Sequence, residues 1–315
     1  MKVRTLYWSH LAAYEKCPQM YLWGYGWGDI DCGGGPGKRK PKPEDRSLHH
    51  PVMGIVIQSV LEDFYNKYLW KHQAGLMDKL VRLTKEKLTS TLAKPRFKIN
   101  WQEISFEEME TICIDGVLGY IKTMKAHKFL GDYAKSEVDL FGYVDKYLPL
   151  GGRADFIIRR EDTGITMLDG KNSKTKMKYT DPDQLRWYAL CHALSYGTFP
   201  DRLGFVWYRY PYEEGTEETG VDWIEFTRRD LKELALRAQK VRKGQRAEKF
   251  DPTPVAKNCR FCDFESVCDA RTVQRAANVA KRRKKVGLPV VADYTGPVEL
   301  GFGSIQTPPD SGKKE

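Results

Sequence analysis

The sequence lacks an apolar run long enough to cross a membrane, and it contains no internal repeat. Near its start, Tyr7-Trp8-Ser9-His10 stands where an export signal would carry its apolar stretch. We therefore expect a cytoplasmic protein with no membrane partner. The seven cysteines are an odd number. In a reducing compartment, clustered cysteines bind metals or undergo redox chemistry more often than they form disulfides.

The 315 residues, 41% of them hydrophobic, suffice for one large domain or two small ones. The formal net charge is +10. The last segment, Lys281 to Glu315, carries seven basic and four acidic residues, so it accounts for +3 of this charge and the rest of the chain for +7. Such a basic body suits a polyanionic partner such as nucleic acid, although many soluble proteins share it.

Hydrophobic periodicity predicts helices followed by alternating strands and helices. We expect helices over residues 8–23, 52–70, 76–92, 104–128, 181–196 and 230–243, and strands over 137–145, 153–160, 164–171, 203–210 and 221–226. Residues 28–50, rich in Gly, Pro and Lys, predict a mobile loop, and residues 286–315 a disordered tail. The remaining chain, residues 1–285, predicts one α/β domain with a mixed central sheet flanked by helices.

A tight group of cysteines, Cys259-x2-Cys262-x5-Cys268, lies in a polar segment near the end of this domain. Two cysteines separated by two residues can place both sulfurs on one metal centre, and a tetrahedral or cubane site needs a fourth ligand. Cys17, followed by Pro18, is the candidate, because proline can end a helix and leave the sulfur exposed. A metal held in this way would fasten the N-terminus to residues 259–268 as a clip.

The other cysteines fit different roles. Cys113 and Cys191 fall within helical apolar patterns and are expected in the core, and Cys32 lies in the expected loop, where it could be a free thiol. The spacing alone leaves three interpretations open, namely an iron–sulfur cluster, a zinc ion, or four cysteines without a metal.

Two carboxylates and a lysine form a second group. Asp155 lies in Gly151-Gly152-Arg153-Ala154-Asp155, and Asp169-Gly170-Lys171 follows in the next expected strand. Side chains alternate along a strand, so Asp169 and Lys171 share a face that Asp155 approaches if the strands pair. The carboxylates would bind Mg²⁺ or Mn²⁺, and the lysine would orient water and offset charge at a phosphate.

A hairpin turn at Asp169-Gly170 explains the same residues equally well on local sequence. Gln184 and Tyr188, four apart on one face of the following helix, favour the metal site, although they would also fit a polar helix surface.

These features together resemble the RecB-like PD-(D/E)xK nuclease superfamily, and most closely its four-cysteine branch of CRISPR-associated RecB-type exonucleases and the AddB nuclease domain. The resemblance covers about residues 8–270. Its elements, in order, are Tyr14-x2-Cys17-Pro18, a helix containing Gly54, Glu137 leading into Gly152-x2-Asp155, Asp169-x-Lys171, Gln184-x3-Tyr188, and Cys259, Cys262 and Cys268. Each motif is weak alone, whereas the set in this order is fairly specific.

The resemblance implies a restriction-endonuclease-like core with a cysteine-clipped region of N- and C-terminal helices. It implies Asp155 and Asp169 as metal ligands, Lys171 as the catalytic lysine, and Gln184 and Tyr188 as residues that shape the site and contact DNA. It also implies a [4Fe–4S] cluster in preference to zinc.

The chain departs from the family at one position, where Gln58 replaces a histidine that binds metal in Gly-x3-His. The amide oxygen of Gln58 can bind Mg²⁺ but is a poorer ligand than imidazole for Mn²⁺, and Glu62, one turn on, is an alternative ligand. His49 and His50 end the expected loop and are expected in solvent. We therefore expect activity that is weaker or has an altered metal preference.

Three functions follow from these observations. The first is a metal-dependent DNA exonuclease that acts on DNA ends or single strands. It would serve recombination, repair, or a phage or CRISPR process in a bacterial or phage-infected cell, and it could have protein partners in a recombination or CRISPR-type complex. The second is a catalytically weak or inactive DNA-binding module, in which aromatics such as Trp187, Trp207 and Tyr208 could stack on bases, although core packing suits most of them. The third is a zinc-ribbon protein that binds RNA.

Overall fold

The computed structural model describes residues 4–26, 47–72, 74–130, 133–176, 180–260, 262–271, 274, 275, 278 and 285. The chain divides into two compact units, Met1–Val267 and Cys268–Glu315. The expected tail 286–315, and residues 28–46 of the expected loop with Cys32, lie outside the described residues. The fold below is that of the first unit.

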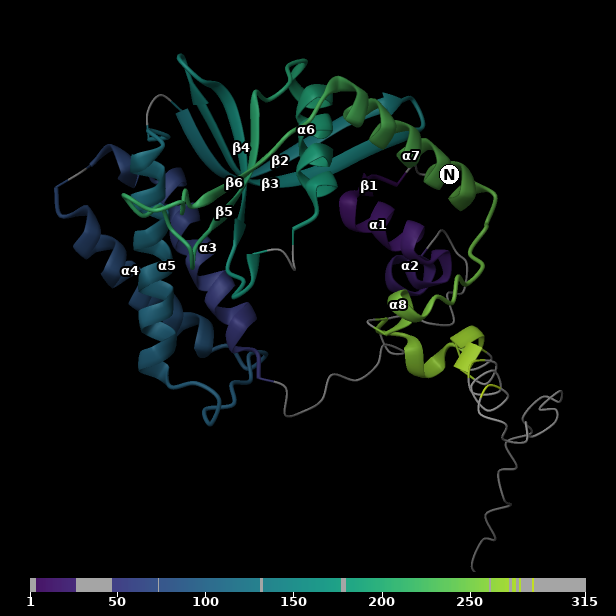
Figure 1. Ribbon diagram of the computed structural model, residues 1–315, viewed down its shortest axis with the longest axis horizontal. Coiled ribbons are helices and arrows are strands. Elements are labelled where there is room, and N and C mark those ends of the chain that lie inside the picture. The colour runs from purple at the N-terminus through teal and green to yellow at the C-terminus, as the bar shows by residue number, and fades with distance from the viewer. Residues whose placement is uncertain are drawn as a thin grey trace, which may run out of the picture. The chain divides into compact units, whose positions relative to one another are not determined.

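A six-stranded mixed sheet forms the centre of this unit (Figure 1). Its strands are β1 (Leu6–Tyr7), β2 (Tyr133–Asp145), β3 (Leu148–Arg160), β4 (Gly164–Lys171), β5 (Arg202–Trp207) and β6 (Val221–Ile224). The long strand β3 pairs antiparallel with β2 along one edge, and with β4 and the parallel β1 on the other. β5 joins β4 in parallel and β6 joins β5 antiparallel. The expected α/β class and mixed sheet are confirmed.

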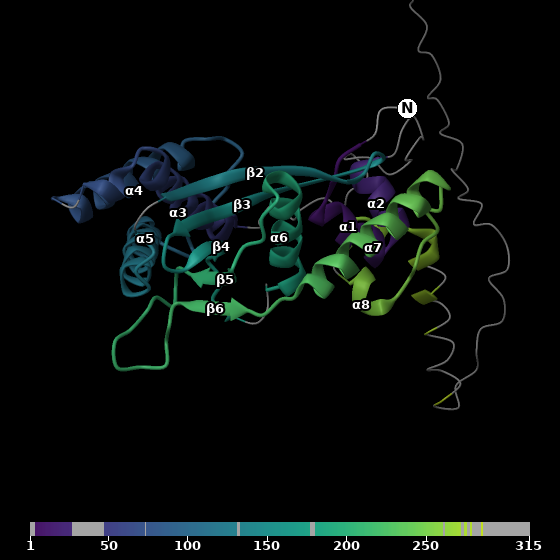
Figure 2. The same cartoon turned by 90° about the horizontal axis from the view of Figure 1, so that it is seen from above.

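The helices cover the sheet in two groups, each with its own apolar core (Figures 1 and 2). One group is α3 (His49–Asn66), α4 (Leu76–Leu92) and α5 (Phe106–Ala126). The short 3-10 helix η2 (Leu69–Lys71), between α3 and α4, packs in the same core. The other is α6 (Pro182–Tyr196) and α7 (Arg228–Arg246), joined by α1 (Trp8–Lys16). α2 (Pro18–Tyr25), α8 (Ala256–Cys259) and η4 (Glu265–Val267) complete the unit.

The helix ends follow local chemistry. Asp181 caps α6 by accepting a hydrogen bond from the Asp183 amide, with Pro182 at the first helical position, as expected. Thr227 and Asp230 form a capping box on α7. The single helix expected over residues 8–23 is instead two helices, because Cys17, which precedes Pro18, adopts an extended conformation.

The expected loop ends earlier than residue 50. Helix α3 begins at His49, and this side chain is only 12% exposed, bonded to Ser47 Oγ at 2.7 Å and 3.6 Å from Glu103. The expectation of a solvated His49 at the loop's end is therefore wrong, whereas His50 is exposed at the same helix start.

The two longest strands change faces at the same level. In β3, Leu150 and Ala154 belong to the core beneath α6, whereas Phe156 belongs to the core beneath α3. In β2, Ala134 belongs to the core beneath α3 and Leu140 to the core beneath α6, so this strand changes faces as well. Asp155 lies at the exchange on β3. Glu137 lies at the exchange on β2, with a positive φ of 56°. This conformation costs a non-glycine residue about 1–3 kcal/mol.

Candidate active site

Strand pairing places three carboxylates in one row across the sheet. The register of β3 with β4, in which Phe156 faces Leu168, sets Asp155 opposite Asp169. The register of β2 with β3, in which Val138 faces Ala154, sets Glu137 opposite Asp155. The amide of Gly170 on β4 donates to Asp155 Oδ2 on β3 at 2.9 Å. This hydrogen bond holds Asp155 beside Asp169.

Strand β4 runs through Asp169 and Gly170 without turning, because both residues pair in parallel with Phe205 and Val206 of β5. The chain reverses earlier, between Arg160 and Gly164. The interpretation of Asp169-Gly170 as a hairpin turn is therefore wrong.

Lys171 lies within the carboxylate row. Its ammonium group forms an ion pair with Asp169, lies 3.5 Å from Gln184 Oε1, and stands 5.3 Å from the centre of the Phe205 ring. The side chain is 17% exposed and that of Asp169 only 4%. A partly buried ammonium beside a buried carboxylate interacts strongly, because little water screens the pair.

Gln184 and Tyr188 reach the same cluster from α6. The amide nitrogen of Gln184 donates to Asp169 Oδ1 at 3.2 Å and to the Tyr188 hydroxyl at 3.0 Å. Their spacing of four residues puts both side chains on the helix face that covers the carboxylates. The structure thus brings Asp155, Asp169, Lys171, Gln184 and Tyr188 together from three elements.

Two glycines make room for this arrangement. A Cβ on Gly170 would clash with the hydroxyl of Tyr208, so only glycine fits between Asp169 and Lys171. A Cβ on Gly152 would lie 2.9 Å from the ring of Tyr188. The motif glycines are therefore explained by the approach of two tyrosines from opposite sides.

The two aspartates carry excess negative charge in a dry environment. Burial raises the pKa of Asp155 well above its usual range, and the neighbouring Asp169 raises it further. Burial also raises the pKa of Asp169, against the opposing effect of Lys171. One ammonium group faces two buried carboxylates, so a further cation would relieve the repulsion.

The oxygen donors of this site fit a hard divalent cation such as Mg²⁺ or Mn²⁺. Within the described ranges, no group of three or more His, Cys, Asp or Glu side chains has the geometry of a ready-made metal site. Asp155 and Asp169 are two neighbouring carboxylates, and a pair of carboxylates suits Mg²⁺ because this ion retains several waters.

Gln58 approaches the row from α3 but points its polar atoms at other residues. Its nitrogen donates to Glu137 Oε1 at 2.7 Å, and its oxygen accepts from the Tyr208 hydroxyl at 2.8 Å. The carboxylate can only accept, which fixes the orientation of the amide. The oxygen expected to bind metal is thus occupied by Tyr208, and Gln58 holds Glu137 in place.

Glu62, the alternative ligand, lies one turn further along α3. It contributes to the raised pKa of Arg153, for which Asp139 is the largest cause. Glu137 was named in the sequence only as a motif element, and the structure places it opposite Asp155. The turn at 146–147 between the two strands was not a sufficient signal, because the register shifts by one residue between Tyr143 and Asp145 before Glu137 comes opposite Asp155.

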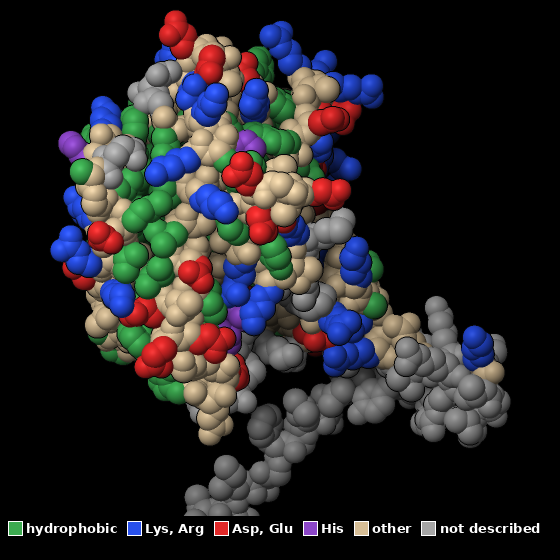
Figure 3. Space-filling view, turned by 60° about the vertical axis from the view of Figure 1, so that its left-hand side comes forward, with side chains coloured by type: hydrophobic (Ala, Val, Ile, Leu, Met, Phe, Trp, Pro, Cys, Tyr) green, Lys and Arg blue, Asp and Glu red, His purple; other side chains and the backbone are tan. Residues whose placement is uncertain are grey.

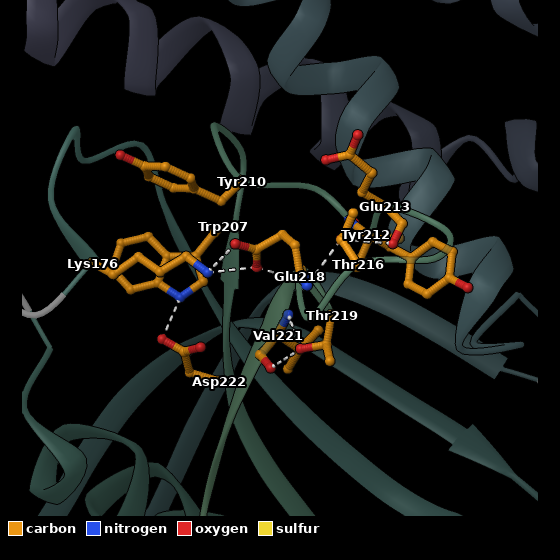
Figure 4. Close-up of polar contacts among 12 residues, drawn as sticks. Lys176, Trp207, Tyr210, Tyr212, Glu213, Thr216, Glu218, Thr219, Val221 and Asp222 are labelled. Atoms are coloured by element: carbon orange, nitrogen blue, oxygen red, sulfur yellow. Dashed lines mark hydrogen bonds and ion pairs between the residues drawn. The ribbon is translucent and has the colours of Figure 1, made fainter.

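The segment after Lys171 is fixed to the connection between β5 and β6 (Figure 4). Lys176 forms an ion pair with Glu218 and lies 5.2 Å from the centre of the Tyr210 ring. The Tyr210 hydroxyl donates to the Lys174 carbonyl at 2.5 Å. Trp207 donates to Asp222 at 2.7 Å, as the figure also shows. The contacts of Lys174 and Lys176 hold the chain in place a few residues beyond Lys171.

The aromatic residues proposed to stack on bases are core residues. Trp187, Trp207 and Tyr208 are 0%, 0% and 3% exposed. The indole of Trp187 donates to the Gly151 carbonyl at 2.9 Å, which docks α6 on β3. Their role is packing, as the alternative interpretation held.

Three of the four expected cluster cysteines lie in the first unit. The Thr253 amide lies 3.5 Å from Cys17 Sγ, and the Thr253 hydroxyl and Asn258 side chain both donate to the Lys16 carbonyl at 3.0 Å. Burial raises the pKa of the Cys262 thiol, and Cys17 and Cys259 add to this effect. Cys268 belongs to the second unit. Cys113 and Cys191 are fully buried, as expected.

A comparison with protein-family models matches residues 7–269 to the PD-(D/E)XK nuclease superfamily. The chain belongs to this superfamily. Most members are nucleases, and the fold is restriction-endonuclease-like. The superfamily generally uses divalent metals, in agreement with the oxygen donors of this site.

Other comparisons add little. No curated protein matches the chain. Among solved structures, the crystal structure of SSO0001 is 15% identical, with a TM-score of 0.30, and the match covers 73% of this chain and 89% of that one. A similarity of this size carries no argument.

The surface does not by itself locate a nucleic-acid path. On the face in Figure 3, Lys and Arg side chains are interspersed with Asp and Glu. The position of a nucleic acid must therefore be inferred from particular side chains.

In the described part of the chain, no helix is long and apolar enough to span a membrane.

Proposed function

We propose that the protein is a Mg²⁺- or Mn²⁺-dependent deoxyribonuclease, an exonuclease that acts on DNA ends or single strands in the cytoplasm during recombination, repair, or a phage or CRISPR process. The observation that carries the proposal is the register of β3 and β4, which sets the buried Asp155 opposite Asp169 with Lys171 beside it. In metal-assisted phosphodiester hydrolysis, oxygen ligands hold the metal and a nearby cation stabilises the charge that develops on the phosphate.

In this proposal Asp155 and Asp169 hold the divalent ion, and Glu137 supplies a further carboxylate on the same row. The bound ion would polarise the scissile phosphate and make water more acidic. Lys171 orients the attacking water and stabilises the charge that develops on the phosphate oxygens. Gln184 holds Asp169 and Lys171 in position, and Gln184 and Tyr188 contact the DNA beside them.

The test is a metal-by-substrate panel on the purified full chain. End-labelled single-stranded and double-stranded DNA would be incubated with Mg²⁺, Mn²⁺ or EDTA. We expect shortening of the labelled strands with Mg²⁺ or Mn²⁺ and intact strands with EDTA. Intact DNA under every condition, from protein that binds DNA with strong salt dependence, would replace this function with that of a DNA-binding module.

The cysteines support a further part of the proposal, a [4Fe–4S] cluster held by Cys17, Cys259, Cys262 and Cys268, with zinc as the other metal that suits thiolates. Its support is the spacing of the last three cysteines and the nearness of Cys17 and Cys259 to Cys262, which raises the pKa of the Cys262 thiol further. Protein purified without oxygen should show visible sulfur-to-iron absorbance. A colourless preparation containing zinc would overturn the iron assignment.

Protein partners in a recombination or CRISPR-type complex complete the proposal. They would be detected as a defined larger assembly when the chain is purified from cells that carry the complex.

A further inference from the structure

Two buried hydrogen-bond donors without partners lie just beyond the catalytic strand. Arg209 follows Tyr208 after β5, and Asn172 follows Lys171 after β4. The Nε of Arg209 donates to Asn172 Oδ1 at 3.3 Å, so the two side chains lie against each other. Arg209 Nη2 and Asn172 Nδ2 are both buried and have no hydrogen-bond partner. Such an unsatisfied buried donor destabilises the fold, and a charged one does so more strongly.

Positive charge gathers around this pair. In the described part of the chain no carboxylate forms an ion pair with Arg209. Partial burial lowers the pKa of His50, and the charges of His49, Lys174 and Arg209 lower it further, against the opposing effect of Glu103. Lys174 is exposed, and its carbonyl is held by Tyr210. The surroundings of the two donors therefore favour an anion.

One face of α3 leads from the carboxylates to this place. Gln58, Gly54 and His50 are spaced by four residues, so they line the same side of the helix. Gln58 contacts Glu137 in the carboxylate row, and His50 lies within electrostatic reach of Arg209. Gly54 between them has nothing within 4 Å of its Cβ position, so the face is open at this point. Eight residues of helix span about 12 Å, the axial rise of roughly three to four nucleotides in a duplex.

We propose that Arg209 and Asn172, with Lys174 and His50 at the rim, bind one backbone phosphate of the substrate strand, a few nucleotides from the phosphate that is cut. The proposal rests on the nuclease function above and assigns a substrate-positioning site to residues outside the superfamily motifs. Arg209 provides a fork of two N–H groups that fits a phosphate, and Asn172 adds a third donor. The strand would pass along the open face of α3 between the two sites.

The first experiment measures binding without cutting. Anisotropy of a labelled single-stranded oligonucleotide in EDTA would compare the wild type with Arg209→Gln, Asn172→Ala and Lys174→Gln. We expect about 10-fold weaker binding for Arg209→Gln, a smaller loss for the others, and a log–log salt slope reduced by about 0.7 for each phosphate that the protein no longer neutralises. Lys232→Gln is the matched control, because Lys232 is an exposed lysine on α7 in the opposite helix layer, and its affinity should stay within about 2-fold.

The second experiment locates the phosphate during cleavage. Oligonucleotides that each carry one neutral methylphosphonate linkage would be cut by the wild type and Arg209→Gln. In the wild type, one linkage a few phosphates from the cut should raise KM with little change in kcat. Arg209→Gln should have a raised KM on the all-phosphate strand and no sensitivity to that linkage.

The two experiments separate this inference from the proposed function. If the wild type cuts no DNA, the nuclease function fails, and the binding series still tests the phosphate site. If the wild type cuts but Arg209→Gln binds as tightly and remains sensitive to the same linkage, the phosphate site is overturned and water is the partner of the two donors. Should Arg209→Gln fail to fold, the exposed Lys174→Gln and the Asn172→Ala variants decide the matter in the same assays.

Discussion

The carboxylate row and the cysteine segment differ in how the chain brings their residues together. Asp155, Asp169 and Lys171 lie on adjacent strands, where backbone pairing fixes each side chain to within one residue. Side-chain hydrogen bonds from Thr253 and Asn258 to the Lys16 carbonyl join the segment around Cys17 to the one that leads into Cys259, and Cys268 belongs to another unit. The sheet positions its side chains without a ligand, whereas in the proposed function a metal would complete the cysteine segment. We therefore predict that chemistry and stability are separable in this chain.

The largest effect is expected at the carboxylate row. Asp169→Asn removes one of the two metal-binding carboxylates and should lower single-turnover cleavage by at least about 100-fold. It should also abolish the rise in Tm that Mg²⁺ gives the wild type. Calorimetry and cleavage assays on the same preparations check this. An unchanged response to Mg²⁺ would place the metal elsewhere and remove the distinction between the two regions.

The next effect concerns the residues behind the row. Gln58→Ala frees Glu137, so cleavage should fall by about 10- to 100-fold, as is typical when a group that orients a metal ligand is removed. Cleavage by Glu137→Gln should fall by a factor in the same range, and this variant should need a higher Mg²⁺ concentration for half-maximal activity. Glu62→Gln is the control from the same helix and should stay within about 2-fold. Equal losses for Glu62 and Gln58 variants would contradict the positioning role of Gln58.

The cysteine segment should affect stability and leave chemistry intact. Cys262→Ser should lose the visible absorbance of the cluster and several kcal/mol of unfolding free energy, about the scale of removing a structural metal. The fraction that remains folded should keep its kcat. Cys32→Ser, the matched control, should change neither property. A Cys262→Ser protein that is stable yet inactive would link the two regions chemically.

The smallest effect has the opposite sign. Repulsion and burial disfavour the charged form of Asp155, so Asp155→Asn should stabilise the metal-free protein at neutral pH by about 1–2 kcal/mol. Because the folded-state pKa is raised, the wild type loses stability as the pH rises above the ordinary carboxyl value of about 4. The gain from Asp155→Asn should therefore vanish below that pH. Chemical denaturation at pH 4 and pH 7 measures it.

A matched aspartate shows the reverse electrostatics. Arg160 holds the pKa of the exposed Asp162 below its usual range. Asp162→Asn should give no stabilisation at pH 7. Stabilisation of both variants alike would mean that general charge reduction, and not the packed carboxylate pair, explains the gain.

The sequence predicted most of the elements because their signals are local. Strand β4 and helix α4 have the expected bounds, and α6 begins after Asp181 and Pro182 as expected. The motif residues were found because alternation on β4 and helical spacing on α6 are readable along one segment. These patterns predict that Asp169 and Lys171 share one face of β4, and that Gln184 and Tyr188 share one face of α6.

What could not be predicted depends on contacts between distant segments. The break at Cys17 follows from Pro18, yet the sequence suggested a continuous helix. The role of Gln58 depends on Tyr208, 150 positions away, and on Glu137, whose positive φ no alternation pattern shows. The two buried donors of Asn172 and Arg209 come together only when β4 and β5 pair. Motif spacing finds residues on one element and leaves out those that meet across the fold.

Single-turnover cleavage by Lys171→Ala, measured beside DNA affinity, tests the central claim most directly. The account predicts that the variant binds DNA within a few-fold of the wild type and takes up Mg²⁺, while cleavage of a labelled strand falls by at least about 100-fold. A variant that cuts DNA at the wild-type rate, or that loses binding and cleavage in equal measure, would show that the row of Asp155, Asp169 and Lys171 is not a nuclease centre.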